Sequence, residues 1–156
     1  MISVDIRDKQ KLCSLNHAAV RAFVREAIRH LLPKRSCRLS LALVEDGEIA
    51  RFNARYLGRD QPTDVLAFGM QEGRTLKGDT TLLGDVMISL ETAGRNAKRF
   101  HVSLEKELAL YLIHGLLHLL GIRDKTPPQR RRMRRKEREL LRRCGKAVSL
   151  KRLMRP

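Results

Sequence analysis

The stretch LALYLIHGLLHLLG, residues 108–121, is apolar at nearly every position. A helix that is apolar on all sides lies in the core of a protein rather than on its surface. Ser103 precedes this segment as a predicted N-terminal cap, and Gly121 is placed to end it. The segment therefore predicts a buried central helix around which the other elements pack.

Two histidines interrupt this apolar helix. His114 and His118 are its strongly polar side chains beyond Glu107, and at a spacing of four they lie on one helix face. That spacing lets two imidazoles bind one metal ion. Gly121 allows a sharp turn that returns Asp124 to the pair, which gives a three-ligand site with one position open for water. The alternative is a pair of core histidines satisfied by hydrogen bonds alone.

Gly115 directly follows the first histidine. In metalloproteases with the HExxH motif this position holds the glutamate that acts as general base, so peptide hydrolysis of that type is not expected. A metal ion can instead polarise a phosphoryl oxygen. Glycine costs about 1 kcal/mol relative to alanine inside a helix, and its use here predicts that another backbone packs closely against the helix.

The rest of the chain alternates between short strands and amphipathic helices. Alternating apolar residues predict strands at residues 2–6, 39–43, 65–70 and 82–90. Three-four spacing predicts a helix at 20–31 and another between the cap Asp46 and Gly58. Residues 91–100 predict a connecting helix or turn, 58–64 a polar turn and 71–81 an exposed loop. This order predicts an α/β (α+β) fold, a single-layer mixed β-sheet of about four strands with helices packed on it and the metal site at the central helix.

The positive charge of the chain is concentrated at its C-terminal end. The formal net charge is +16, and residues 125–156 contain fourteen basic and two acidic residues. Such a field attracts polyanions, nucleic acid above all, while a solvated tail or an acidic membrane surface are the alternatives. Because aromatic residues make up only 4% of the chain, contacts to the nucleic-acid backbone should outweigh base reading. The residues predicted to contact the nucleic-acid backbone are Arg130, Arg131, Arg132, Arg134 and Arg135.

Length and composition predict a single soluble domain, residues 1–156, with a basic helix and tail from Pro127 onward. No apolar run approaches the ~20 residues needed to cross a bilayer. The N-terminal segment MISVDIRDKQ has no apolar signal core, so we expect a cytoplasmic protein with no membrane partner. Cys13, Cys37 and Cys144 are scattered without a CxxC motif, which predicts reduced thiols rather than disulfides.

Three segments together resemble one known family. HGLLHLLG, residues 114–121, is similar to the HGxLHLxGYDH signature of the YbeY family of bacterial rRNA maturation endoribonucleases. NARYLGRDQPTDVLAF, residues 53–68, and LLGDVMIS, residues 82–89, resemble two further segments of that family in the same order. The resemblance covers residues 37–145. It implies one zinc ion per chain and a single-strand-preferring RNase that acts in rRNA maturation and ribosome quality control, with ribosomal RNA and the small subunit as partners.

The chain departs from the family pattern at the third zinc ligand. Aligned without a gap, the third histidine of the family falls on Asp124, and we expect His114, His118 and Asp124 to hold the metal. Asp124 is a harder ligand that adds a negative charge. A one-residue slip would instead place Lys125 at the ligand position and leave two protein ligands.

A second departure is Leu57, where the family has an arginine thought to hold phosphate or substrate. Arg59 or Arg55 can replace it, and Arg59 is our candidate catalytic residue. Asp85, which follows Gly84, either supports the metal from outside its ligand shell or closes a β-bulge.

The sequence thus predicts a zinc-dependent endoribonuclease that acts on ribosomal RNA. The alternative from another class is a non-catalytic, ribosome-associated RNA-binding protein whose metal site is degenerate, which Leu57 and Asp124 favour. A metal-dependent hydrolase of peptides or small molecules would leave the basic C-terminal segment without a role.

Overall fold

The structure is a computed structural model that describes residues 1–59, 61, 63–69, 75–76 and 80–156. The elements, in chain order, are β1 (Ile2–Asp8), α1 (His17–Leu31), β2 (Cys37–Val44), α2 (Asp46–Leu57), β3 (Val65–Gly69), β4 (Thr75–Leu76), β5 (Thr80–Ser89), α3 (Leu90–Arg99), α4 (Leu104–Leu119), α5 (Pro127–Ala147) and the 3₁₀ helix η1 (Leu150–Leu153). Among these described elements, no helix is both long and apolar enough to cross a bilayer.

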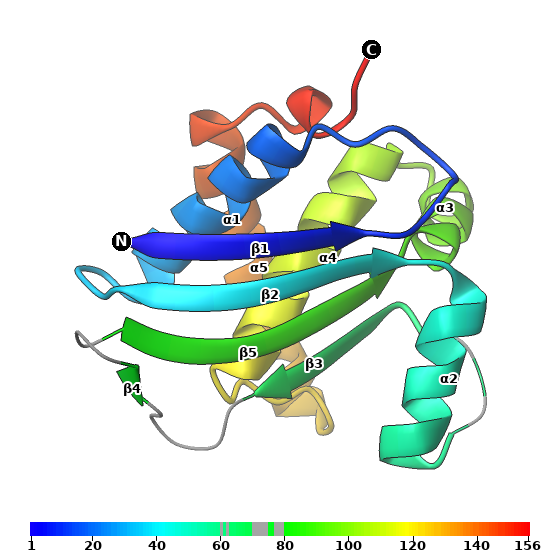
Figure 1. Cartoon of the computed structure of the whole chain (residues 1–156), viewed down its shortest axis with the longest axis horizontal. Helices are drawn as coiled ribbons and strands as arrows, with labels where there is room; N and C mark the ends of the chain where they lie inside the picture. The colour runs from blue at the N-terminus through cyan, green and yellow to red at the C-terminus, as the bar shows by residue number, and fades with distance from the viewer. Residues whose placement is uncertain (60, 62, 70–74, 77–79) are drawn as a thin grey trace.

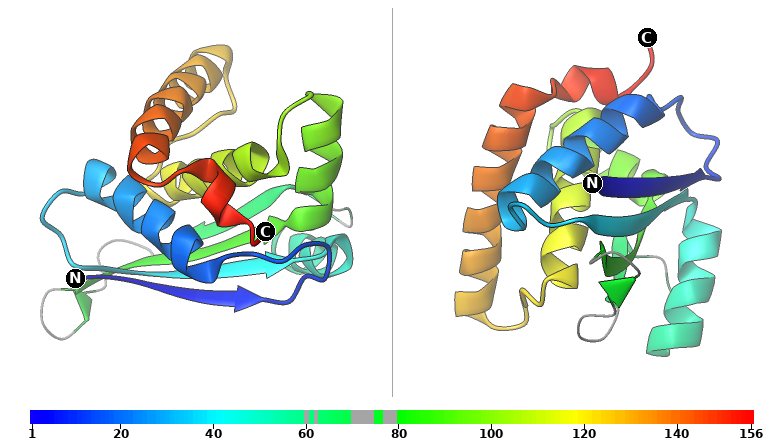
Figure 2. Two further views of the ribbon diagram at one scale, coloured as in Figure 1. Left: turned by 90° about the horizontal axis from the view of Figure 1, so that it is seen from above. Right: turned by 60° about the vertical axis from the view of Figure 1, so that its left-hand side comes forward.

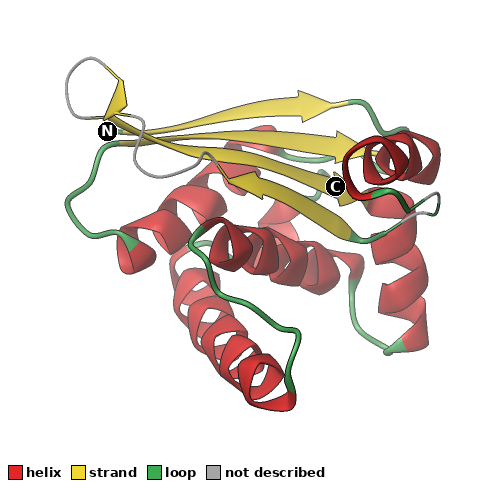
Figure 3. Ribbon diagram, turned by 90° about the horizontal axis from the view of Figure 1, so that it is seen from below, coloured by secondary structure: helices red, strands yellow, loops and turns green. Residues whose placement is uncertain are grey.

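The strands form one mixed sheet in the order β1-β2-β5-β3, with the short β4 paired to β5. Strands β1, β2 and β5 run parallel, and β3 runs antiparallel to β5. Helices α1 and α4 cover one face, and α5 packs on the far side of these two helices (Figures 1 and 2). Figure 3 shows the sheet and this helical layer edge-on. The predicted fold class is confirmed.

The two faces of the sheet follow from the alternation of side chains along each strand. In β2 the apolar Leu39, Leu41 and Leu43 are buried under the helices, whereas Arg38 and Ser40 point to the opposite face and are exposed. Helix α2 covers one end of that opposite face through a small apolar cluster of Val44, Ile49, Leu66 and Met87. No helix of the described chain covers the remainder of this face (Figure 1).

Helix α4 occupies the centre of the core, as predicted. Leu108 and Ile113 are fully buried, and Ser103 caps the helix by accepting a hydrogen bond from the backbone N–H of Lys106. A Cβ at Gly115 would lie 2.6 Å from Cγ1 of Val86 on β5. The close packing predicted at this glycine is therefore real, but the prediction of a neighbouring backbone was wrong, because valine side chains fill the space.

Other local predictions need correction. Asp46 is not the cap of α2 but its first residue, and its carboxylate accepts hydrogen bonds from the hydroxyls of Ser89 and Thr92. Within the predicted loop 71–81, Thr75–Leu76 form β4 and the last two residues begin β5. The other residues of that loop, and residues 60 and 62 of the predicted turn 58–64, lie outside the described residues. Residues 91–100, predicted as a helix or turn, are largely helical.

The C-terminal tail returns to the start of α1. Leu153 is fully buried, and its carbonyl accepts a hydrogen bond from the backbone N–H of Asn16, the residue that caps α1.

The three cysteines are free, as predicted, and burial raises the pKa of Cys144 to about 11. A thiol with such a pKa stays protonated and unreactive at neutral pH.

Candidate metal centre

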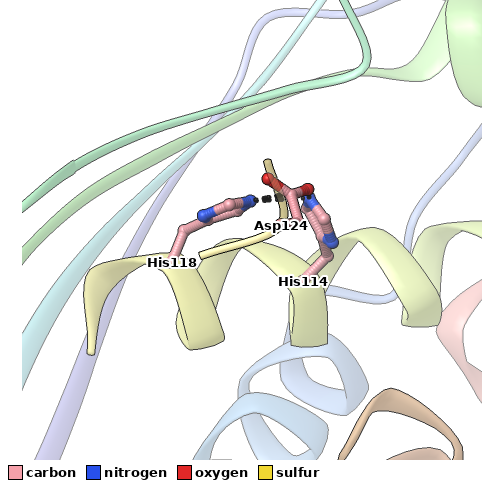
Figure 4. A group of neighbouring side chains, drawn as sticks. All are labelled: His114, His118 and Asp124. Carbon is pink, nitrogen blue, oxygen red and sulfur yellow. Dashed lines mark hydrogen bonds and ion pairs between the residues drawn. The ribbon is translucent and has the colours of Figure 1, made fainter. Parts of the chain in front are cut away.

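Three side chains from α4 and the segment after it converge on one point (Figure 4). The Nε2 atoms of His114 and His118 lie 2.9 Å apart. Oδ2 of Asp124 lies 3.4 Å from Nε2 of His118 and 3.7 Å from Nε2 of His114. The structure therefore brings together the three residues that the sequence singled out.

The turn that returns Asp124 depends on Gly121. Its φ of 84° lies in the left-handed region, which glycine adopts without strain. The N–H of Gly121 donates to the carbonyl of His118, and the N–H of Ile122 donates to the carbonyl of Leu117. This pair of bonds is the Schellman motif, which ends a helix and reverses the chain. The sharp turn predicted at Gly121 is confirmed.

The geometry of the three donors fits a single metal ion. Tetrahedral coordination with bonds of about 2.0–2.1 Å places neighbouring donors about 3.3 Å apart. The observed separations of 2.9, 3.4 and 3.7 Å lie on both sides of that value. The side chains of His114, His118 and Asp124 are 24, 30 and 36% exposed, so the site is open to a substrate on one side. Two imidazoles and a carboxylate suit zinc and other first-row divalent ions.

A fourth residue, Glu137 of α5, orients this site. Its Oε1 lies 2.7 Å from Nδ1 of His114, and its side chain is only 12% exposed. A buried carboxylate at this distance holds the proton on Nδ1, which leaves the lone pair of Nε2 directed at the other two donors. Carboxylate–histidine pairs of this kind are usual around protein-bound metals.

Glu137 was not among the site residues predicted from the sequence, although the sequence contains a signal for it. Met133, Leu140 and Cys144 form the buried stripe of α5, and Glu137 lies on the same stripe. An acidic residue on the apolar stripe of an otherwise basic helix needs a buried partner. The partner could not be identified without the packing of α5 on α4.

The electrostatic environment of His114 favours a cation. Burial lowers the pKa of this ring, but the hydrogen bond to Glu137 and the charges of Glu137, Asp124 and Asp64 outweigh burial, so that its pKa is raised above the usual value. The same carboxylates that favour the imidazolium favour a divalent metal, because both species are positive.

The structure also bears on the two alignments at the third ligand. Lys125 is exposed, and its backbone N–H donates to Oε1 of Gln129 in the capping box at the start of α5. Asp124, not Lys125, faces the two histidines. The geometry therefore supports the ungapped alignment.

No described ion pair joins the candidate catalytic arginine to this cluster. Arg59 is exposed just after Gly58, and among the described residues no ion pair joins it to Asp124. Leu57, where the family has arginine, is 55% exposed at the end of α2. The guanidinium of Arg55 lies over the ring of Tyr56, 5.6 Å from its centroid. A catalytic role for Arg59 stays a prediction.

Asp85 does not support the metal centre. Its neighbour Val86 points to α4, so Asp85 points to the opposite face of the sheet, where it is exposed. The pairing of β2 with β5 shifts register just before Gly84, whose φ is 130°. Of the two alternatives, the β-bulge is the one that the structure supports.

The five predicted RNA-binding arginines lie in the first half of α5 and are exposed, namely Arg130, Arg131, Arg132, Arg134 and Arg135. The guanidinium of Arg130 donates to the carbonyl of Lys125, which ties it to the loop that carries Asp124. The basic surface and the three-donor cluster are therefore joined by a few residues of chain.

The fold and the site define a small mixed α/β protein with a three-donor cation site on its central helix. A profile of the family described as Endoribonuclease YbeY matches residues 5–145. Endoribonuclease YbeY of Syntrophus aciditrophicus is 38% identical over 141 residues, 89% of this chain and 88% of the relative. That of Halalkalibacterium halodurans is 33% identical over 149 residues, 90% of this chain and 94% of the relative. The chain belongs to the YbeY endoribonuclease family.

A solved structure supports the fold independently. The solution structure of TM1509 from Thermotoga maritima superposes with a TM-score of 0.61 at 24% identity, and the match covers 94% of this chain and 91% of that one. The resemblance noted in the sequence over residues 37–145 thus extends in both comparisons towards the N-terminus.

Proposed function

We propose that this protein is a metal-dependent endoribonuclease that cleaves single-stranded RNA in ribosomal RNA maturation. The metal is zinc, one per chain, held by His114, His118 and Asp124. The substrate is ribosomal RNA, met in the cytoplasm on the small ribosomal subunit. Membership of the YbeY endoribonuclease family supports the reaction class.

The convergence of the three donors is the observation that carries the proposal. A divalent cation at this position supplies a Lewis acid for the phosphoryl oxygens of a phosphodiester. Glu137 keeps the proton of His114 on Nδ1, so that the lone pair of Nε2 remains available to bind the metal ion. The open side of the cluster, where all three side chains are partly exposed, admits the phosphodiester.

Helix α5 supplies the attraction for RNA. Its first turn contains no acidic residue, and its first half carries the five arginines. Of the five, Arg130 lies in the first turn, where a positive charge opposes the helix macrodipole and does not stabilise the helix. The exposed charge of all five arginines beside the metal centre supports a role in binding phosphates. Arg59 is the further cation that we assign to the scissile phosphate, in place of the arginine missing at Leu57.

Cleavage assays on purified variants test this function. We expect His114→Ala and Asp124→Ala to lose metal and to abolish cleavage of single-stranded ribosomal RNA fragments. His30→Ala, which removes an exposed histidine paired with Glu26 on α1, serves as the control and should retain both properties. Arg59→Gln should lower cleavage without loss of metal.

A specific outcome selects the alternative function. Leu57 and Asp124 depart from the family pattern, which favours a non-catalytic RNA-binding protein of the ribosome. Full RNA binding, together with no bound metal and no cleavage by the unaltered protein, would establish that alternative and overturn the enzyme.

A further inference from the structure

The face of the sheet that points away from α4 carries a groove of about 670 Å³. The strands form its floor, and α2 forms one wall through Phe52 and Tyr56. In Figure 1 this face is turned towards the viewer, with α1, α4 and α5 behind the strands. The three metal-binding candidates do not line this groove.

A polar row crosses the floor of the groove from strand to strand. Asp5 of β1 pairs with Ser40 of β2, Ser40 pairs with Asp85 of β5, and Asp85 pairs with Phe68 of β3. Since cross-strand partners point to the same face, these four side chains lie in line. Arg7 lines the groove one pleat further along β1. The floor therefore offers two carboxylates, a hydroxyl and the guanidinium groups of Arg7 and Arg38, and it ends at an aromatic ring. Arg38 is paired with Asp5 at 3.0 Å, which leaves Asp85 and Arg7 as the charged groups without a described ion-pair partner.

Three aromatic rings form the wall at that end. Tyr56 stacks on Phe52 with centroids 5.7 Å apart, and it meets Phe68 at 5.4 Å with the planes tilted. Tyr56 is nevertheless 55% exposed, with the guanidinium of the exposed Arg55 5.6 Å from its ring centroid. Aromatic residues make up only 4% of the chain, so three of them grouped beside a polar floor are a concentrated stacking surface. Exposed aromatic rings beside cationic groups are the usual platform for unstacked bases.

The chemistry of the groove favours a nucleobase over an apolar peptide or a lipid. An apolar ligand would leave the charged groups of the floor, Asp85 and Arg7 among them, desolvated without partners. A base has an apolar face for Tyr56 and a polar edge, and its phosphate is a partner for Arg7. A carboxylate accepts from the exocyclic amino group of cytosine but repels the carbonyl oxygen that uracil has at the same position.

We propose that this groove binds one amino-bearing base of single-stranded RNA, at a distance from the metal centre. The base stacks on Tyr56, its amino group donates to Asp85, and the phosphate lies towards Arg7. The inference rests on the proposed function in one respect, that RNA is the substrate. It adds a base-selective subsite on the opposite face of the sheet.

Binding of a cleavage-resistant 2′-O-methyl oligonucleotide of about ten nucleotides tests the stacking. Tyr56→Ala should weaken binding about tenfold, and Tyr56→Phe should bind as the unaltered protein does, since it keeps the ring. Phe100→Ala is the matched control, because Phe100 is 57% exposed with Arg99 over its ring at 5.6 Å but does not line the groove. Equal loss in Phe100→Ala and Tyr56→Ala, or no loss in either, would overturn the proposal.

Mononucleotides test the base selectivity without any cleavable bond. In NMR titrations CMP should bind more tightly than UMP and shift the backbone amides of Ser40, Asp85 and Phe68. Asp85→Asn should remove most of this preference, because a neutral amide can accept from cytosine and donate to uracil alike. Equal affinity for CMP and UMP in the unaltered protein, or shifts confined to residues that do not line the groove, would refute the subsite.

Different results would refute the endoribonuclease function and the base-binding groove. A protein that does not cleave RNA but binds it through Tyr56 would refute the enzyme and retain the groove. A protein that cleaves RNA, with Tyr56→Ala equal to the unaltered protein in both oligonucleotide affinity and KM, would retain the enzyme and refute the groove.

Discussion

Helices α4 and α5 pack against each other, yet their compositions are opposite. Helix α4 is apolar on nearly every side, and most of its residues are buried. Helix α5 is basic, and only Met133, Glu137, Leu140 and Cys144 are buried in it. The two meet where Nδ1 of His114 contacts the carboxylate of Glu137. Each helix thus carries one polar side chain into an apolar interface, and the two side chains satisfy each other.

The two helices contribute different parts of the site. Helix α4 contributes the imidazoles and, through its C-terminal turn, positions Asp124. Helix α5 contributes the orienting carboxylate on its inner side and cationic charge on its outer side. Changes in α4 should therefore affect folding and metal together, whereas changes in α5 should separate metal affinity from RNA affinity.

The largest effect is expected from the contact between the helices. Glu137→Gln should weaken zinc binding about 10- to 100-fold, as loss of an outer carboxylate does at other metal sites. Glu139→Gln on the same helix is the matched control, since Glu139 is exposed and, among the described residues, pairs with Arg143 alone at 3.0 Å. Competition with a chromogenic chelator measures both affinities. If the two variants bind zinc equally, α5 does not orient the site.

The packing of the two helices predicts opposite results for two glycines. Gly115→Ala places a methyl group 2.6 Å from Cγ1 of Val86, a stiff side chain, and should lower the free energy of unfolding by about 1–2 kcal/mol. Gly145→Ala meets only Leu150 at 4.0 Å and should raise it by about 0.5–1 kcal/mol through helix propensity. Urea unfolding measures both. Destabilisation by both variants would contradict the contrast in packing.

Substitutions on the outer side of α5 should change the affinity for RNA and leave the affinity for zinc unchanged. The double variant Arg131→Gln with Arg135→Gln should weaken binding of single-stranded RNA about tenfold and reduce the salt slope of log K by about 1.4. Zinc affinity should not change. Lys34→Gln with Arg35→Gln removes the same charge from an exposed loop before β2 and serves as the control. An equal loss in both double variants would mean that only net charge matters.

The smallest effect is a pH dependence of the metal-free protein. Because the pKa of His114 is raised in the folded state, protonation of this ring stabilises the fold below the unfolded pKa of about 6.5, and this contribution is lost as the pH rises through the folded-state pKa. An NMR titration of His114 should show a midpoint that falls in Glu137→Gln. A midpoint unaffected by this substitution would place the cause of the shift elsewhere.

The sequence predicted most of the fold because its signals were local. The apolar run of α4, the cap at Ser103 and the left-handed Gly121 each depend on near neighbours in the chain. The three converging donors also lie within a short segment, so their spacing was enough to single them out.

The remaining features depend on contacts between distant segments. Glu137 meets His114 only because α5 packs on α4, and Asp46 bonds to Ser89 only because α2 meets the end of β5. The row across the sheet that contains Asp85 follows from the register of four strands. No local pattern of residues encodes these pairings, which tertiary structure alone defines.

Zinc titration of the metal-free protein, followed by native mass spectrometry, tests the central claim most directly. We expect one zinc ion per chain, with affinity reduced by at least about tenfold in each of His114→Ala, His118→Ala and Asp124→Ala. A protein that binds no zinc, or that binds it equally well after all three substitutions, would contradict the account.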